Sequence, residues 1–175
     1  MRLAITFLGL FFLAAISPSG LHPRAHAQEH TYSSAKFNYS VEFPSQTWRL
    51  VDEPDELHQH AEFVYGDRND GYLRIRKETL EEGLDIKEFA RRDQDQKERF
   101  RPGYVDGKDD TFMGRLAGRT VSFEYTQAGK PMAGRSYYLQ GDSHTIYVLR
   151  FTGMRDKLLR IRNQTDLIAR SFKLK

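Results

Sequence analysis

Apolar and polar residues alternate along several short stretches of the chain. In residues 37–43 an aromatic or aliphatic side chain occupies every second position, and the same period of two recurs in residues 116–127, 133–140 and 144–152. A period of two is typical of a strand with one buried face. Because only short turns separate the last three stretches, they predict an antiparallel meander.

Two further β-type runs, residues 61–65 and 72–77, lie closer to the N-terminus. Between them Asp70 and Gly71 form an Asp-Gly pair, which predicts a tight hairpin turn because glycine accepts a positive φ. Residues 28–35 are polar and predict a frayed end.

Two segments have the period of an α-helix. Residues 85–100 begin with Asp85, followed three positions later by Glu88, which is the pattern of a capping box. The segment has an apolar side that ends at Phe100, and its other positions are heavily charged, so we expect a surface helix. Residues 154–172 carry one apolar stripe at spacings of three and four and predict a second helix.

These elements predict a single α+β domain over residues 28–175, an antiparallel β-sheet meander flanked by helices. The chain shows no internal repeat, low-complexity tract or linker. About 150 residues suffice for one hydrophobic core, and a chain without cysteine depends on that core, since it forms no disulfide.

The order of aromatic, glycine and proline positions is similar to that of a known family. An aromatic strand leads through Pro44 to Trp48, and later aromatic strands precede a closing helix. This pattern resembles the PsbP-like family, named for an extrinsic subunit of photosystem II. The resemblance implies an α/β/α sandwich and an exported, non-enzymatic protein; it carries over no catalytic or binding residue and implies no photosynthetic role. The matching stretches are residues 37–48, 118–125, 135–139, 145–153 and 169–173.

The N-terminus has the features of a secretory signal. Arg2 precedes an apolar run over residues 3–16, and Ala25 and Ala27 form the small-x-small pattern that signal peptidase reads. The run is shorter than the roughly 20 residues that span a bilayer. We therefore expect a cleaved signal peptide over residues 1–27 and a periplasmic or extracellular protein, with an uncleaved anchor as the alternative.

Cleavage changes the charge of the protein. Loss of Arg2 and Arg24 lowers the formal charge from +3 to +1, which removes the basic excess that a nucleic-acid-binding protein needs. The remaining charge is uneven, with −7 over residues 28–110 and +8 over residues 111–175. Two interpretations stay open: the halves interleave and neutralise each other, or the surface is polarised and docks a charged partner.

One short segment has the residue types of a metal site. His58, His60 and Glu62 alternate, so in an extended chain they share one face. Two imidazoles and a carboxylate suit Zn²⁺ or another late first-row metal. The competing interpretation is a solvated polar loop.

The sequence contains no Gly-x-Ser-x-Gly, no His-Glu-x-x-His and no glycine-rich phosphate loop. We therefore expect a non-catalytic accessory or binding domain that contacts a protein partner or membrane complex in the cell envelope. Any membrane contact should be peripheral, through the basic side of the last helix. The alternatives are a small-ligand or metal-binding protein that uses the segment from His58 to Glu62, and a hydrolase with a non-standard site.

Overall fold

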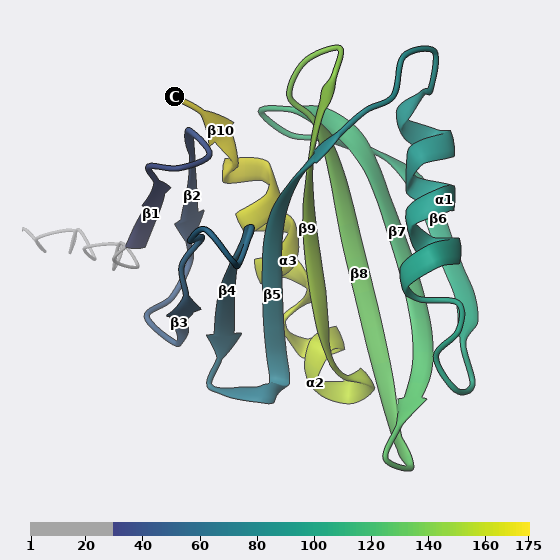
Figure 1. The fold of residues 1–175 in the computed structure, drawn as a ribbon. Helices are drawn as coiled ribbons and strands as arrows, with labels where there is room; N and C mark the ends of the chain where they lie inside the picture. The colour runs from purple at the N-terminus through teal and green to yellow at the C-terminus, as the bar shows by residue number, and fades with distance from the viewer. Residues whose placement is uncertain (1–29) are drawn as a thin grey trace, which may run out of the picture.

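The structure is a computed structural model that describes residues 30–175 (Figure 1). Its strands are β1 (His30–Ser34), β2 (Tyr39–Phe43), β3 (Trp48–Asp52), β4 (His60–Tyr65), β5 (Asp67–Thr79), β6 (Val105–Met113), β7 (Ala117–Gln127), β8 (Lys130–Gln140), β9 (Thr145–Met154) and β10 (Lys173–Leu174). Its helices are α1 (Ile86–Lys97), α2 (Arg155–Arg160) and α3 (Arg162–Ser171). The strands form a seven-stranded sheet, in the order β3-β4-β5-β9-β8-β7-β6, and a three-stranded sheet, in the order β1-β2-β10.

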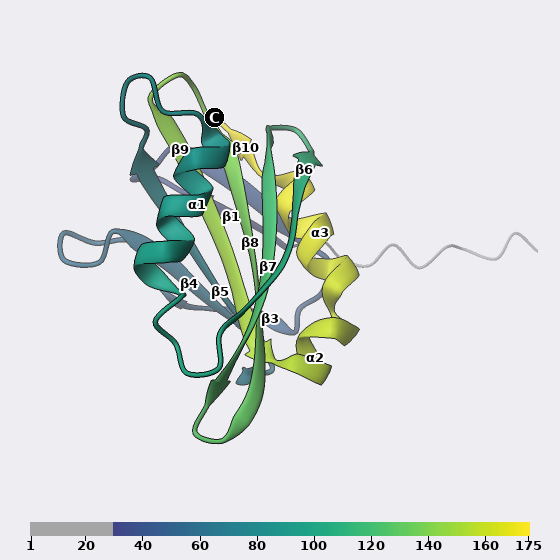
Figure 2. The same ribbon diagram turned by 90° about the vertical axis from the view of Figure 1, so that its right-hand side faces the viewer.

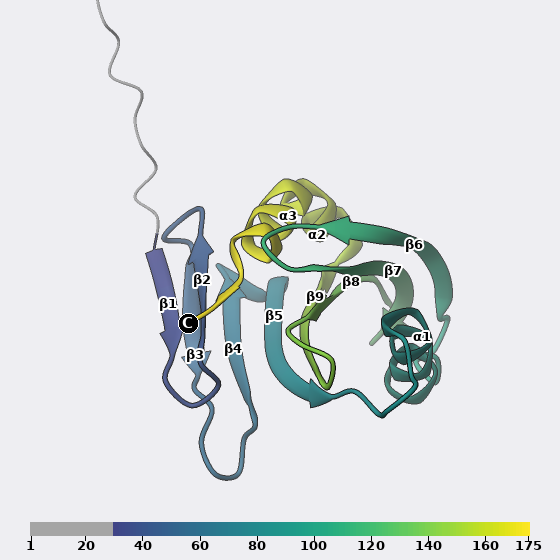
Figure 3. The same ribbon diagram turned by 90° about the horizontal axis from the view of Figure 1, so that it is seen from above.

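The helices cover opposite faces of the larger sheet (Figure 2). α1 packs on β7 and β8, whereas α2 packs on β5, β8 and β9. α3 follows α2 on the same side and packs on β2 of the smaller sheet. Seen from above, the larger sheet curls around α1 (Figure 3). The predicted α+β class, with an antiparallel sheet between helices, is confirmed.

Successive side chains of each central strand point alternately into two hydrophobic cores, one on each face of the larger sheet. On the side of α2 and α3, Tyr137, Leu149 and Phe151 are fully buried, and on the side of α1, Tyr138 and Val148 are fully buried. Burial of one such side chain stabilises the fold by about 1.5–3 kcal/mol. Consecutive strands from β6 to β9 pair antiparallel, so the predicted meander is confirmed.

The predicted turn between β4 and β5 was placed wrongly. Gly66, with a φ of 63°, makes the turn, and Gly71 lies inside β5. A Cβ atom at Gly71 would lie 2.8 Å from Ile161 and 3.0 Å from Tyr65. This glycine is therefore required by close packing against a distant segment, which the local Asp-Gly pattern does not reveal.

Both ends of the described chain differ from the prediction. The polar stretch predicted as a frayed end contains β1, which pairs with β2. The predicted single helix over residues 154–172 is two helices, because Ile161 leaves the helical conformation with φ −99° and ψ 10°. Ile161 is buried in the core, so tertiary packing outweighs the continuous helical pattern. The chain then ends in β10, which pairs with β2.

The predicted signal peptide, residues 1–27, lies outside the described residues. Over residues 30–175 the structure has no helix that combines the length and the apolar character needed to cross a membrane.

Candidate functional site

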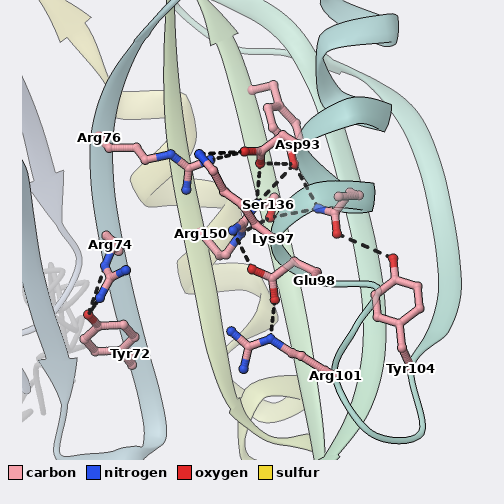
Figure 4. Close-up of polar contacts among 12 residues, drawn as sticks. Tyr72, Arg74, Arg76, Asp93, Lys97, Glu98, Arg101, Tyr104, Ser136 and Arg150 are labelled. Atoms are coloured by element: carbon pink, nitrogen blue, oxygen red, sulfur yellow. Dashed lines mark hydrogen bonds and ion pairs between the residues drawn. The ribbon is translucent and has the colours of Figure 1, made fainter.

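An arginine-lined pocket opens on the α1 face of the larger sheet. Its volume is about 230 Å³, and it lies where β5 and β9 pass the C-terminal end of α1 (Figure 4). In β5, Tyr72, Arg74 and Arg76 alternate with Leu73 and Ile75, so the polar side chains face the pocket while the aliphatic ones are buried on the opposite face. The lining residues are Arg68, Tyr72, Arg74, Arg76, Glu98, Arg101, Tyr125, Gln127, Arg150 and Thr152.

Arg150 forms the floor of the arginine pocket and anchors α1 to the sheet. Its guanidinium donates to Asp93 Oδ2 and to Glu98 Oε1, each at 2.5 Å, and to Ser136 Oγ at 3.0 Å. All three nitrogens of the guanidinium thus have a partner, and only 8% of the side chain is exposed. Tyr138 donates a further hydrogen bond of 2.9 Å to Asp93. Arg150 is therefore held at all three nitrogens and serves to fix the position of α1.

Asp93 is the centre of this buried network. Besides Arg150, it contacts Arg76 at 2.5 Å and Lys97 at 3.0 Å. Burial alone would raise the pKa of the Asp93 carboxyl, but the charges of the three surrounding cations, Arg150 foremost, hold the pKa below its usual value. Asp93 therefore stays ionised and keeps the cations in place.

The outer wall of the pocket is formed by Arg74 and Arg68 around Tyr72. Arg74 Nη2 donates to Glu62 Oε1 at 2.7 Å, and Arg68 lies over the ring of Tyr72 with its guanidinium carbon 4.2 Å from the centroid. Burial and the neighbouring Glu62 raise the pKa of Tyr72 to about 12, so its hydroxyl remains a neutral hydrogen-bond group. This wall offers guanidinium groups on an aromatic support.

The opposite wall is formed by Arg101, which follows α1. Its guanidinium carbon lies 4.6 Å from the ring centroid of Tyr125, and its Nε lies 2.6 Å from Glu98 Oε2. Within residues 30–175, the two terminal nitrogens of Arg101 donate no hydrogen bond to the protein. These N–H groups are free to bind an incoming acceptor.

The pocket and the network behind it retain a positive charge, since six cations face four carboxylates. A guanidinium binds a carboxylate or phosphate through two parallel N–H donors, so the arrangement suits an anionic group. The cations are Arg68, Arg74, Arg76, Lys97, Arg101 and Arg150, and the carboxylates are Glu62, Glu78, Asp93 and Glu98.

The arginine pocket was not predicted from the sequence, because the charged positions of α1 were expected to face solvent. Asp85 caps the helix as predicted and accepts a hydrogen bond from the amide of Glu88. However, Asp93 and Glu98 are buried, and Phe100, predicted on the apolar side, is 75% exposed beyond the end of the helix. A usable signal was Arg150, a single charge inside an otherwise apolar strand.

The predicted metal-ligating residues lie near one another but do not converge on one point. The ring centroids of His58 and His60 are 6.0 Å apart, and His60 Nε2 lies 3.0 Å from Glu62 Oε1. His58 Nδ1 contacts Asp55 at 3.3 Å instead. Over residues 30–175, no group of three or more histidine, cysteine, aspartate or glutamate side chains is placed to hold a metal ion. Metal binding by His58, His60 and Glu62 stays a prediction.

Comparisons with known proteins give structural but no sequence relatives. No known family model matches the chain, and no curated protein is similar to it in sequence. Cyanobacterial PsbP (CyanoP) from Synechocystis is 12% identical, with a TM-score of 0.63 over 93% of this chain and 99% of that one. LpqN of Mycobacterium tuberculosis is 16% identical, with a TM-score of 0.57 over 86% and 92%. A variant of Mog1 is 9% identical, with a TM-score of 0.61 over 83% and 95%.

At these identities the comparisons establish the fold. The chain has a PsbP-like fold, as the sequence resemblance implied.

Proposed function

We propose that this protein is an exported, non-catalytic accessory protein whose arginine pocket binds an acidic segment of a protein partner in the cell envelope. The observation that carries the proposal is the gathering of five arginines around one pocket, where Arg101 and Arg68 keep donor groups directed to solvent. An acidic peptide supplies the carboxylates that such donors bind with two hydrogen bonds each.

Two further observations support this proposal. LpqN, which shares the fold, is described as involved in cell envelope biogenesis, and the N-terminal 27 residues have the pattern of a secretory signal. An envelope location would place the arginine pocket among membrane-associated proteins.

The proposal is tested with a fluorescent hexaglutamate peptide and the chain that begins at Gln28. We expect binding that weakens as salt is added, because the contacts are ionic. The double variant Arg68→Gln/Arg101→Gln should weaken binding by about tenfold or more, since a hydrogen bond to a charged group contributes about 1.5–3 kcal/mol. Fluorescence anisotropy measures both effects.

A charge-matched control separates the pocket from the general charge of the surface. Arg115 and Arg160 have side chains that are 48% and 73% exposed and lie outside the arginine pocket. The variant Arg115→Gln/Arg160→Gln loses the same two charges and should bind almost as the unmodified protein does. Equal weakening in the two double variants would show that the pocket has no special role.

Partner identification uses the same two variants. The tagged protein, purified from its own envelope, should retain a partner that is absent when the Arg68→Gln/Arg101→Gln variant is used. Recovery of the same proteins with both double variants would contradict a role for the pocket in partner binding.

A further inference from the structure

A second cavity lies on the opposite face of the larger sheet from the arginine pocket. It is enclosed by α2, the start of α3 and strands β6, β7 and β8, and its volume is about 430 Å³. Pockets for small molecules usually measure about 300–1,000 Å³, so this cavity has the size of a ligand site. Its apolar side chains are those of Val105, Ala133, Leu158 and Leu159.

The cavity exists because small residues form its floor. β6 shifts register between Asp106 and Asp109, which leaves Gly107 beside Ser122. A Cβ atom at Gly107 would lie 2.6 Å from the carbonyl oxygen of Ser122. Only glycine fits this close approach, and its neighbours Asp106 and Lys108 both line the cavity.

The mouth of the cavity carries exposed apolar side chains. Val105 on β6 and Leu159 on α2 are 59% and 61% exposed, although both line the cavity. Leu158, the neighbour of Leu159, is buried at the inner wall. An apolar ligand would remove both exposed side chains from water, which is favourable in proportion to the apolar area covered.

Cationic side chains surround this apolar interior. Arg135 and Arg155 each contact a carboxylate at 3.1 Å, Asp166 and Glu124 respectively. Lys108 and Arg162 also line the cavity, and across residues 30–175 neither has an ion-pair partner. Asp106 lines the cavity too, and it pairs with Arg99 at 2.9 Å. Four cations and two carboxylates thus line the cavity, so its rim keeps a positive charge around the apolar interior.

We infer that this cavity binds a single-chain amphiphile with a carboxylate head, of the long-chain fatty-acid class. The acyl chain would occupy the apolar interior, and the carboxylate would bind at Arg162 and Lys108 on the rim. A stable protein interface covers about 800 Å² on each partner. The cavity offers far less surface than that, so a small ligand fits it better than a protein partner does. The site is independent of the proposed function, because the sheet separates it from the arginine pocket.

The test is calorimetric titration of the chain that begins at Gln28 with dodecanoate below its micellar concentration. We expect one ligand per protein. Dodecyltrimethylammonium, which has the same chain and a positive head, should bind at least about tenfold more weakly, because the rim repels it. Hexanoate should also bind more weakly, since it buries less apolar area.

Two exposed positions provide variants with matched controls. Leu159→Glu places a negative charge at the mouth, whereas Leu167→Glu makes the same change on α3, where Leu167 is 53% exposed and does not line the cavity. Arg162→Gln removes a rim charge, and Arg160→Gln removes a neighbouring charge outside the cavity. We expect Leu159→Glu and Arg162→Gln to weaken dodecanoate binding by about tenfold, and the controls to leave it unchanged.

Amide shifts in a proton–nitrogen spectrum locate the ligand independently of affinity. Added dodecanoate should shift Gly107, Ser122 and Ala133, and the Arg68→Gln/Arg101→Gln variant should bind it normally. Absence of saturable binding, equal affinity for the cationic amphiphile, or equal effects of Leu159→Glu and Leu167→Glu would each overturn the inference. Circular dichroism of each variant checks that the fold is retained.

Discussion

At the scale of single residues, buried charge distinguishes this protein from an ordinary sheet with a surface helix. Arg150, Asp93 and Glu98 are each at least nine-tenths buried, and such charges are tolerated only when they are paired and hydrogen-bonded. The ion pairs of Arg150 with Asp93 and Glu98 join α1 to β9. They also hold the other arginines of the pocket close to the end of α1. The network thus specifies where the helix docks, a role that buried ion pairs fulfil in some proteins.

Removal of one member of this network should be costly. Asp93→Asn removes the buried carboxylate that Arg150 and Arg76 share and leaves each arginine with one carboxylate, Glu98 or Glu78. We therefore expect the free energy of unfolding to fall by about 3–5 kcal/mol. Denaturation in guanidinium chloride measures this change in the free energy of unfolding. Asp95→Asn, on the same helix but 30% exposed, should cost less than about 1 kcal/mol. Similar losses in the two variants would mean that the Asp93 network contributes no more than surface pairs.

The lowered pKa of Asp93 also predicts how stability changes with pH. The pKa of an aspartate in the unfolded chain is about 3.9, and the cations around Asp93 keep its folded pKa below that value. The stabilisation is therefore complete above about pH 4 and is lost as the pH falls through the folded pKa. The free energy of unfolding, measured between pH 7 and pH 2, should decline as the pH falls. The decline should be less steep for the Asp93→Asn variant than for the unmodified protein. Parallel curves for the two proteins would contradict this assignment.

At the scale of elements, hairpins follow local rules more closely than helices do. The β7–β8 hairpin has two turn residues, Ala128 and Gly129, with φ values of 49° and 74°, as a two-residue turn requires. Pro131 follows this turn and already belongs to β8. The last helical segment, in contrast, breaks at Ile161 although its apolar stripe is continuous.

Two glycines of this hairpin should respond differently to substitution. A Cβ atom at Gly134 would lie 2.0 Å from the ring of Phe123, which is buried opposite it in β7, so Gly134→Ala should cost about 3 kcal/mol through overpacking. Gly129 has no neighbour within 4 Å of such an atom, and Gly129→Ala should cost about 1 kcal/mol through its positive φ. Denaturation curves compare the two. A larger loss at Gly129 would contradict the packing explanation.

At the scale of the whole molecule, the uneven charge of the two halves is largely resolved by the fold. The acidic N-terminal half and the basic C-terminal half interleave, and ion pairs connect them at Glu98–Arg150, Asp109–Arg119 and other places. This arrangement favours the interpretation that the halves neutralise each other. The surplus positive charge is local, at the arginine pocket on one face and at the rim of the apolar cavity on the other.

Much of this architecture could be predicted from periodicity, because a period of two reports which face of a strand is buried whatever its neighbours are. The meander followed from that signal. The N-cap at Asp85 followed from the capping-box pattern with Glu88, and the α+β class followed from the strands together with the helical spacing. Residues 72–77 were predicted as a β-type run, and the structure places Arg74 and Arg76 on one face of β5, opposite Leu73 and Ile75.

Periodicity carries no information about which distant strands pair, and the arginine pocket depends on that pairing. β5 lies beside β9, with Arg74 opposite Arg150, and α1 lies over the same face with Asp93 and Glu98 turned inward. From the sequence alone, a charged position in a helix is expected to face solvent. Its burial becomes favourable only when another element supplies a buried opposite charge. The chain therefore predicts most strands and their buried faces locally, whereas the neighbourhood of each charge depends on contacts between distant segments.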